Sequence, residues 1–575
     1  NAAAEKDKGL FLDGVVGGSA DLTLQHRGIA TGFTYTTSIV HFNNSGNTYS
    51  GTVTVAPMAG VNGGSYLGLS ATNALQYATV NLNGNNSGAK FGNSPLVFNK
   101  GIGSANIGAL AGSGNVVLTG YDEINYTGGE NIVLTVGSNN ASTTYSGIMS
   151  GGGSLTKTGT GTMLLSGTST FTGDIIINAG TVTANTMQGS TPTASNLGAL
   201  QPVANRNIIV NGGGILSLIN GNILGTGAST NTLSNTTLIV NAGGVFETGK
   251  DGAGAGWWNK VGAVNLNGGT IRIGSGANDT NFLTLALIGT VTVGGSSASV
   301  IDTHASSDPG YTAIHLGQNA TPGQSVIFDV ADVTGTSTSD LTITAKMTNT
   351  SANLVASGLT KIGAGTMTLG AANAYTGATT INAGTLALSG AGAIDTSPTV
   401  SIATGAALDT TAKTGTFTPA ASQTLVIGVD ATGAGSSGVI NAANLDLSTA
   451  VVSFNITGTL DDPEYVIANY SGTLNGTIAA AAPSGYTYDY GTGSNSQVKL
   501  VPAAGYTSWA DTNAPTGGAN DDYDNDGVPN GVEYVLGGLA STNDIDKLPV
   551  VSTSGGNLVF TFVRDQDSET PDTTV

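Results

Sequence analysis

Apolar and polar residues alternate over short stretches along most of the chain, and clusters of Gly, Asn and Ser separate these stretches. Runs such as TVTVA at 52–56 and NIVLTV at 131–136 are rich in β-branched residues. This alternating period is typical of strands that bury one face. Segments with a helical period are almost absent, so the pattern predicts an all-β protein.

Two long stretches, 155–184 and 359–388, align without a gap and are identical at half of their positions. A shorter motif recurs in and between them, consisting of an apolar strand, Asn, a small residue, Gly and a second apolar strand. Its asparagines are Asn178, Asn211, Asn241, Asn267 and Asn382. The first four recur about every 30 residues, which is about one coil of a β-solenoid with three short strands.

The repeats also predict how successive coils pair. Stacked coils place parallel strands about 4.8 Å apart, so an Asn at the same turn of each coil can hydrogen bond to the next. We therefore predict a ladder of Asn178, Asn211, Asn241 and Asn267, and we expect Asn and Gly to adopt positive φ at these turns. The residues expected to face inward are Leu155, Met163, Leu165, Ile177, Val182, Leu359, Met367, Leu369, Ile381 and Leu386. Phe171 and Tyr375 occupy equivalent positions, which we interpret as structural.

The pattern LTKxGxGTMxL…[FY]TG…INAGT in both long copies resembles the autotransporter-associated β-strand repeat of large surface proteins of Gram-negative bacteria. The resemblance implies a right-handed parallel β-helix that is exported and displayed outside the cell. It also implies that the chain has no enzymatic activity.

We divide the chain into four regions. Residues 1–150 form an N-terminal β region expected to join the solenoid, and residues 151–449 form the β-helix with the repeats. Residues 450–502 are expected to be a β cap, and residues 503–575 a small separate module. Near the start, LFLDGVV at 10–16 is either an end cap or a strand that pairs with a neighbouring molecule.

The C-terminal module contains DDYDNDGVPNGVEYVLGG, which fits the twelve-residue calcium loop D-x-D-x-D-G-x5-E. Gly527 would supply the sharp turn, and NGVEYVLGG predicts a short helix ended by Gly537. The preceding AGYTSWADTNAPTGGAN is interpreted as a linker, so the loop resembles half of an EF-hand, as in dockerin-like or thrombospondin-type calcium loops. The alternative is a solvated acidic linker. The predicted calcium ligands are Asp522, Asp524, Asp526, the Val528 carbonyl, Asn530 and Glu533.

The ends of the chain suggest a longer native protein. LPVVSTSGGNLVFTFV predicts a β-hairpin that stops in an open strand, and the module resembles the C-terminal region of repeat-rich surface proteins from Verrucomicrobia-type bacteria. At the other end no basic and apolar leader is present. We therefore expect an exported chain, extracellular or on the outer surface, whose signal peptide has been removed or which is an internal piece.

Composition narrows the possible functions. Only 9% of the residues are charged, 88 of 575 are Gly, and Cys is absent, which excludes disulfides and thiol chemistry. The net charge is −20, and residues 511–575 carry 12 acidic and two basic residues, a net of −10. This balance argues against binding to nucleic acid or to an anionic membrane. No apolar run is long enough for a transmembrane helix.

Chemistry-bearing residues outside the calcium loop are sparse. Asp302, His304 and Asp308 are the best catalytic candidates, and isolated surface residues are the simpler interpretation. Trp257 and Trp258 could contact a glycan or pack on the solenoid. We predict a non-enzymatic structural protein that self-assembles into a surface or released fibre stiffened by calcium. A glycan-binding adhesin and, less favoured, a polysaccharide-degrading β-helix remain alternatives.

Overall fold

The structure is a computed structural model of the 575-residue chain. It describes residues 9–564 except a set of internal segments. These segments are 26–35, 57–62, 87–89, 123–126, 186–199, 201–202, 204, 220–222, 225–235, 250–258, 275–284, 305–311, 318–323, 350–355, 433–434, 461, 492–495, 504, 515 and 555–556.

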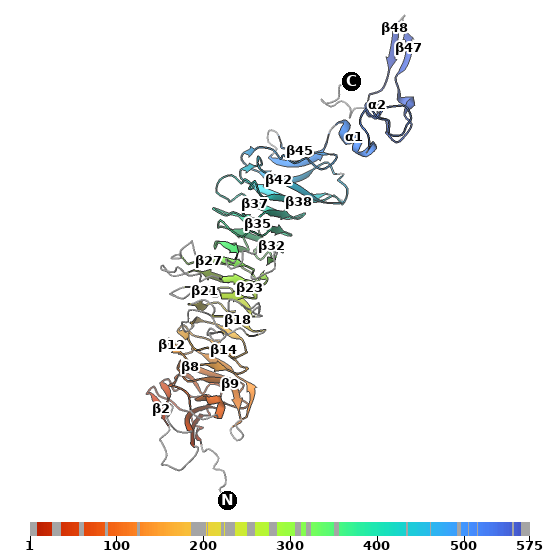
Figure 1. The fold of residues 1–575 in the computed structure, drawn as a ribbon. Helices are drawn as coiled ribbons and strands as arrows, with labels where there is room; N and C mark the ends of the chain where they lie inside the picture. The colour runs from red at the N-terminus through yellow and green to blue at the C-terminus, as the bar shows by residue number, and fades with distance from the viewer. Residues whose placement is uncertain are drawn as a thin grey trace. The chain divides into compact units, whose positions relative to one another are not determined.

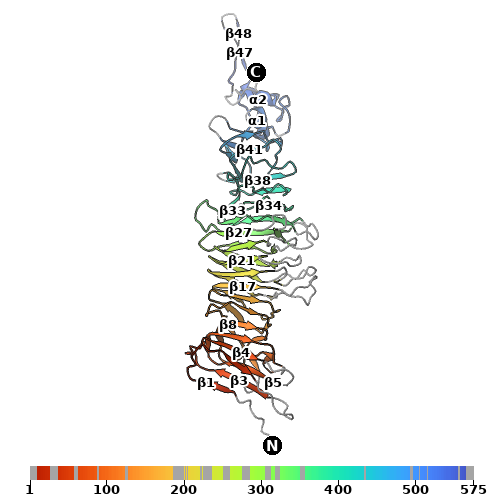
Figure 2. The ribbon, with the colours of Figure 1, turned by 90° about the vertical axis from the view of Figure 1, so that its left-hand side faces the viewer.

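The chain forms two compact units, one of residues 1–380 and 384–397 and the other of residues 381–383 and 398–575. In both units, short strands that follow one another around a coil pair in parallel with the strands of the next coil, as Figures 1 and 2 show. The chain is almost entirely β, and the predicted β-solenoid is confirmed.

The first unit contains three columns of strands. One column consists of β11 (Val133–Val136), β14 (Ser154–Lys157), β16 (Ile175–Ile177), β18 (Asn207–Val210), β20 (Thr237–Asn241), β23 (Ala263–Asn267), β26 (Val291–Val293), β29 (Ser325–Val330) and β32 (Gly358–Ile362). A second consists of β2 (Leu22–Gln25), β4 (Thr52–Ala56), β6 (Leu75–Leu82), β8 (Ser104–Gly112), β12 (Thr143–Tyr145), β15 (Thr162–Leu165), β17 (Gly180–Ala184), β19 (Gly214–Leu218), β21 (Val245–Thr248), β24 (Thr270–Ile273), β27 (Ser299–Thr303), β30 (Leu341–Ile343), β33 (Thr366–Leu369) and β35 (Thr385–Leu388).

The third column of the first unit is interrupted. Its first part consists of β1 (Leu10–Leu12), β3 (Thr36–Phe42), β5 (Gly63–Leu69), β7 (Leu96–Asn99), β9 (Val116–Tyr121), the antiparallel β10 (Gly128–Asn131) and β13 (Met149–Ser150), with a 3-10 turn at Lys90–Asn93. Its second part consists of β22 (Asn259–Val261), β25 (Leu285–Leu287), β28 (Ile314–Leu316) and β31 (Met347–Asn349).

Register shows how the repeats map onto coils. Leu155 pairs with Ile175, so the first long repeat contains the beginnings of two successive coils. Ile208 pairs with Leu238, and Leu238 pairs in turn with Val264. The coils that begin at these residues differ in length through their connecting segments, while the paired strands keep their alternation.

The solenoid core forms along the predicted positions. All ten residues predicted to face inward are at most 2% exposed, and Phe171 and Tyr375 are fully buried. Neither aromatic stacks on the other. The Arg206 guanidinium lies 4.6 Å from the Phe171 ring centre, and the Tyr375 hydroxyl lies 2.7 Å from Thr379 Oγ1.

The N-terminal β region joins the solenoid of the first unit. Strands β2, β4, β6 and β8 pair in series, and β8 continues into both β11 and β12. At the start of the third column, β1 pairs in parallel with β3, and the Phe11 ring stacks on His41 with centroids 4.6 Å apart.

The second unit continues the same kind of coil and then changes. Its parallel strands are β36 (Thr399–Ile402), β37 (Ala407–Thr410), β38 (Thr424–Asp430), β40 (Val439–Ala442), β41 (Leu445–Asp446), β42 (Val451–Thr457), β43 (Tyr465–Tyr470) and β44 (Leu474–Asn475). Antiparallel strands then follow, with β46 (Gln497–Pro502) pairing with β43 and with β45 (Tyr486–Asp489), while β39 (Ser436–Ser437) turns back on β38. Strand β34 (Thr379–Ile381) lies at the boundary of the two units.

Beyond β46, the chain forms two helices and a hairpin. The elements are α1 (Tyr506–Asn513), α2 (Asn530–Leu536), a 3-10 turn at Ile545–Lys547, and the strands β47 (Val550–Ser554) and β48 (Asn557–Thr561). Gly537 ends α2 with a φ of 70°, as predicted. No helix in the part of the chain that the structure describes combines the length and apolar character needed to span a bilayer.

The prediction that a linker without a helix precedes the acidic loop is wrong. Helix α1 occupies that stretch, and its Tyr506 and Trp509 rings contact Tyr534 of α2, with centroids 5.8 and 5.7 Å apart. Positions i and i+3 of a helix are neighbours, so the two rings lie on one side of α1. The gain from aromatic packing outweighs the weak helix propensity of this Thr- and Asn-rich segment.

Candidate metal centre

Residues 522–533 bring three carboxylates together. Oxygen atoms of Asp522, Asp524 and Asp526 all lie within 4.8 Å of one another. The backbone turns sharply between and after them, because Asn525 and Gly527 have φ values of 63° and 93°. Gly527 tolerates this conformation at no steric cost, since it lacks a Cβ.

Backbone amides hold these carboxylates in place. The Asp526 amide donates to Asp522 Oδ1 and Asp524 Oδ1, both at 3.1 Å. The Gly527 amide donates to Asp522 Oδ2 at 2.8 Å. These hydrogen bonds fix the carboxylates of Asp522 and Asp524 close to that of Asp526, and the three negative groups repel one another.

Glu533, in the first turn of α2, is a further carboxylate near this group but is not one of the three whose oxygens lie within 4.8 Å of one another, and it is only 1% exposed. Neither of its carboxylate oxygens has a hydrogen-bond partner among the described residues, and buried Asp524 Oδ2 also lacks one. Burial, followed by the charges of Asp524 and Asp526, raises the pKa of Glu533 to about 7. A buried carboxylate without a partner is costly, so this arrangement fits a bound cation.

The other two predicted ligands have different surroundings. Asn530 is fully buried, and its Oδ1 accepts from the Tyr523 amide at 2.9 Å while its Nδ2 donates to the Gly518 carbonyl at 3.1 Å. Its side chain therefore ties the loop to the segment before it. The Val528 amide donates to Asp526 Oδ1 at 2.7 Å.

Asp544, which the sequence analysis did not single out, connects the acidic loop to the segment after α2. Its amide donates to Asp526 Oδ2 at 2.6 Å, and its own Oδ2 accepts from the Leu539 amide at 2.5 Å. Asp544 also contributes to the raised pKa of Glu533. Asp544 lies 18 residues after Asp526 in the sequence, so the loop motif gives no indication of this contact.

The first four asparagines of the repeat motif are hydrogen bonded in series. Asn211 Nδ2 donates to Asn178 Oδ1 at 2.7 Å, Asn241 to Asn211 at 2.6 Å, and Asn267 to Asn241 at 2.9 Å. The expected positive φ is wrong for the asparagines. The glycines Gly180, Gly213, Gly243 and Gly268 have it instead, because they lack the Cβ that makes this conformation costly for Asn.

A second series in the second unit was not predicted. Asn469 Nδ2 donates to Asn441 Oδ1, and Gln497 Nε2 donates to Asn469 Oδ1, both at 2.9 Å. Asn441 lies in INAA at 440–443, a degenerate copy of the repeat motif. This copy is the sequence feature from which the second series could have been predicted. Gln497 enters on an antiparallel strand, so no repeat period leads to it.

Of the proposed catalytic residues, Asp302 and His304 are described, and each contacts a charged residue of another strand. Asp302 forms a two-pronged ion pair with Arg272, with both contacts at 2.9 Å. His304 Nε2 lies 3.7 Å from Glu247 Oε2. Asp308, Trp257 and Trp258 lie outside the described residues.

Two segments match the passenger-associated-transport-repeat family. They are residues 155–191 and 359–388, which contain the two long repeats. These repeats are associated with autotransporter passengers, which implies export of the chain to the cell surface. No curated protein and no solved structure matches the chain.

Proposed function

We propose that this chain is a structural protein of the cell surface, or of a released fibre, whose solenoid coils associate with further copies. The proposal gives the passenger-associated repeats a mechanical role rather than a catalytic one. It also assigns calcium to the acidic loop, where the ion would order the C-terminal module.

Open strand edges support the self-association. In the first unit, β1 is the outermost strand of its sheet, with Leu10 58% and Phe11 48% exposed. In the second unit, β42 pairs with β38, and no strand covers its other edge among the described residues. Val451 and Ile456 of β42 are exposed. Such edges accept further strands, and a head-to-tail contact that does not close produces a filament.

The composition strengthens this argument. Proteins that must stay monomeric protect open edges with charged side chains, Lys above all. Neither β1 nor β42 contains a charged residue. The exposed residues of these strands therefore present apolar surface and unpaired backbone groups together.

The choice of calcium rests on the ligand chemistry. Carboxylate and carbonyl oxygens suit a hard cation, and Ca²⁺ tolerates six to eight such ligands in flexible geometry. Asp522, Asp524, Asp526 and Glu533 would hold the ion by carboxylate oxygens, and Val528 by its carbonyl. The bound cation would neutralise the unpartnered Glu533 carboxylate.

Negative-stain electron microscopy of the purified chain tests this function. We expect regular fibres with calcium, and looser or shorter fibres after EGTA. Phe11→Lys and Ile456→Lys place a charge at the two open edges and should disperse the fibres. Tyr77→Lys, at an exposed aromatic residue away from these edges, is the matched control and should leave them intact. Dispersed monomers of the unaltered chain in calcium would contradict the proposal.

A further inference from the structure

Five Asn-Gly pairs lie among the described residues, and all are open to the same reaction. The backbone nitrogen of the glycine can attack the side-chain carbonyl carbon (Cγ) of the asparagine, since glycine has no Cβ to hinder the approach. Such asparagines belong to the thermolabile residues of a protein. We expect hydrogen bonds that hold either reacting group to slow the attack. The asparagines of the five pairs are Asn83, Asn211, Asn267, Asn475 and Asn530.

Three of these pairs, all in the first unit, have one reacting group held. Asn211 and Asn267 belong to the ladder, where each side chain hydrogen bonds to a neighbouring asparagine. Asn83 is exposed, but the Gly84 amide donates to the Leu82 carbonyl at 3.0 Å. The attack has to break these contacts first, so the three pairs are protected.

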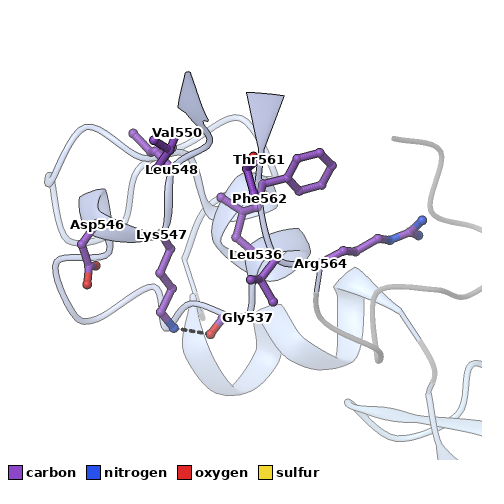
Figure 3. Close-up of a pocket in the computed structure, with 10 residues that line it drawn as sticks. Leu536, Gly537, Asp546, Lys547, Leu548, Val550, Thr561, Phe562 and Arg564 are labelled. Atoms are coloured by element: carbon purple, nitrogen blue, oxygen red, sulfur yellow. Dashed lines mark hydrogen bonds between the residues drawn. The ribbon is translucent and has the colours of Figure 1, made fainter. Parts of the chain in front are cut away.

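The pair at the start of α2 is held at both groups. Asn530 is fully buried, and both ends of its side-chain amide are hydrogen bonded. The Gly531 amide donates to the Ala519 carbonyl at 2.8 Å. The other end of α2 is held as well, because the Lys547 ammonium group donates to the Gly537 carbonyl beside a surface pocket, as Figure 3 shows. Local opening of this helix is therefore costly.

The fifth pair, Asn475–Gly476, lacks this protection. Both residues are exposed. Within the described part of the chain, the Asn475 side chain forms no hydrogen bond and the Gly476 amide donates to no group. Strand β44 (Leu474–Asn475) pairs with β41 (Leu445–Asp446) over two residues. So short a pair opens at low cost, which lets Asn475 rotate into the geometry of attack.

The fold requires the glycine of this pair. Gly476 has a φ of 68°, which is costly for residues that carry a Cβ. A Cβ at this position would also lie 2.5 Å from the Ser448 backbone nitrogen. The turn and the close approach therefore both demand glycine, and the reactive pair is built into the end of β44.

The residue beside Asn475 determines what the reaction would change. Asp446 is the register partner of Asn475 in the parallel pair, and such partners lie about 4.8 Å apart. Hydrogen bonds from the Ser448 hydroxyl at 2.6 Å and from its amide at 2.9 Å lower the pKa of Asp446. Asp446 is therefore charged at neutral pH. A second carboxylate at position 475 would face it directly, and like charges in this arrangement are destabilising.

We propose that Asn475 converts spontaneously to aspartate and isoaspartate in the folded chain, and that the new carboxylate loosens the β41–β44 pair. The Gly476 nitrogen bonds to Asn475 Cγ, and its proton passes through water to the side-chain nitrogen. The bond between Cγ and that nitrogen then breaks and releases ammonia. Water opens the resulting cyclic imide at either carbonyl, which leaves aspartate or isoaspartate. Water is the only co-reactant, and the reaction does not depend on the fibre proposed above.

Peptide mapping by mass spectrometry of the full chain, incubated in calcium, tests the proposal. We expect the converted fraction at Asn475 to exceed that at Asn530 by about tenfold or more, because two hydrogen bonds hold the Asn530 side chain. Both products should form, and faster in mildly alkaline than in mildly acidic buffer, because the attack requires loss of the Gly476 amide proton. In urea, where the fold is lost, the two sites should convert at similar rates.

Variants test the consequence for the β41–β44 pair. Asn475→Asp carries the charged product and should unfold at a lower urea concentration than the unaltered chain. Adding Asp446→Asn to this variant should restore the midpoint, since it removes the facing charge. Asn83→Asp, at the other exposed asparagine of the five pairs, should leave the midpoint unchanged.

Three results would overturn the proposal. The first is conversion of Asn475 no faster than that of Asn530 in the folded chain. The second is aspartate without isoaspartate, which indicates direct hydrolysis of the side chain. The third is an unchanged midpoint for Asn475→Asp. The first two measurements use the unaltered chain, so they hold even where a variant fails to fold.

Discussion

The solenoid and the C-terminal module treat buried carboxylates in opposite ways. In the solenoid, Asp340 is fully buried, and its oxygens accept from the amides of Val333, Thr334 and Thr366 at 2.7–2.9 Å. In the module, Glu533 is equally inaccessible and accepts from no group among the described residues.

The presence or absence of hydrogen-bond donors distinguishes Asp340, which has a structural role, from Glu533, which is a candidate metal ligand. A carboxylate that receives several backbone N–H groups is stable in its charged form, and Asp340 needs nothing from outside the chain. Glu533 is buried near other carboxylates instead, and burial, followed by their charges, raises its pKa. The unsatisfied group indicates where an external cation is expected.

The largest effect is expected from calcium and Glu533. Calcium at a thousand times its dissociation constant should stabilise the module by about 4 kcal/mol, measured by the thermal transition of the Trp509 fluorescence in a chain whose other two tryptophans, Trp257 and Trp258, are replaced by Phe. Glu533→Gln should remove most of this calcium dependence. Without calcium, the variant should be more stable than the unaltered module, because it removes an unpartnered charge.

The control for Glu533 is Glu464→Gln, at a half-exposed glutamate paired with Lys499. We expect it to change the calcium dependence little, since exposed ion pairs contribute at most about 1 kcal/mol. If calcium stabilises the Glu533→Gln chain as much as the unaltered chain, Glu533 is not a calcium ligand. The proposed difference between Glu533 and the hydrogen-bonded Asp340 would then be contradicted.

His315 tests a neutral polar group of the solenoid. Its ring is buried, and burial lowers its pKa from 6.5 to about 4. Since the unfolded chain binds this proton first, stability is complete above pH 6.5 and falls as the pH decreases towards 4. The loss is about 3 kcal/mol. Urea unfolding across this range should show the slope, and His315→Gln should reduce it. An unchanged slope in the variant would contradict the assignment.

Two buried lysines give opposite predictions for the same substitution. Lys361 Nζ donates to the Ile362 and Gly363 carbonyls at 3.0 and 2.8 Å, so Lys361→Met should destabilise the solenoid by about 2 kcal/mol. Lys260 Nζ is buried without a hydrogen-bond partner among the described residues, so Lys260→Met should be neutral or stabilising. Urea unfolding midpoints of the two variants check both predictions. Equal losses of stability in the two variants would show that the hydrogen-bond partners of the lysine do not determine whether the substitution destabilises the solenoid.

The smallest effect is expected within the asparagine ladder. Asn211 donates to Asn178 and accepts from Asn241, so Asn211→Ala should cost about 1 kcal/mol in urea unfolding. Asn455→Ala, at an exposed residue of β42, is the comparison and should cost less. Similar losses in the two variants would mean that the ladder contributes nothing beyond a surface Asn.

The solenoid was predictable from the sequence because the repeats indicate both the length of a coil and the register in which strands of successive coils pair. The spacing of Asn178, Asn211 and Asn241 places their amides one coil apart, and strand alternation determines which side chains are buried. Helix α1 escaped prediction because its stability comes from the Tyr506 and Trp509 rings packing on Tyr534, a contact between separate segments.

The candidate site was predictable only in part. The loop pattern names its acidic residues, and the structure brings Asp522, Asp524 and Asp526 together. The lack of partners for Glu533 and the contact from Asp544 depend on how α2 and the following turn pack. No local pattern carries that information.

Isothermal titration of the purified chain with calcium tests the central claim most directly. We predict one saturable site that is lost in Glu533→Gln and kept in Glu464→Gln, with magnesium binding more weakly because it demands near-ideal octahedral geometry. Absence of calcium binding, or equal binding by the Glu533→Gln chain, would contradict the account of the unpartnered carboxylate as a cation ligand.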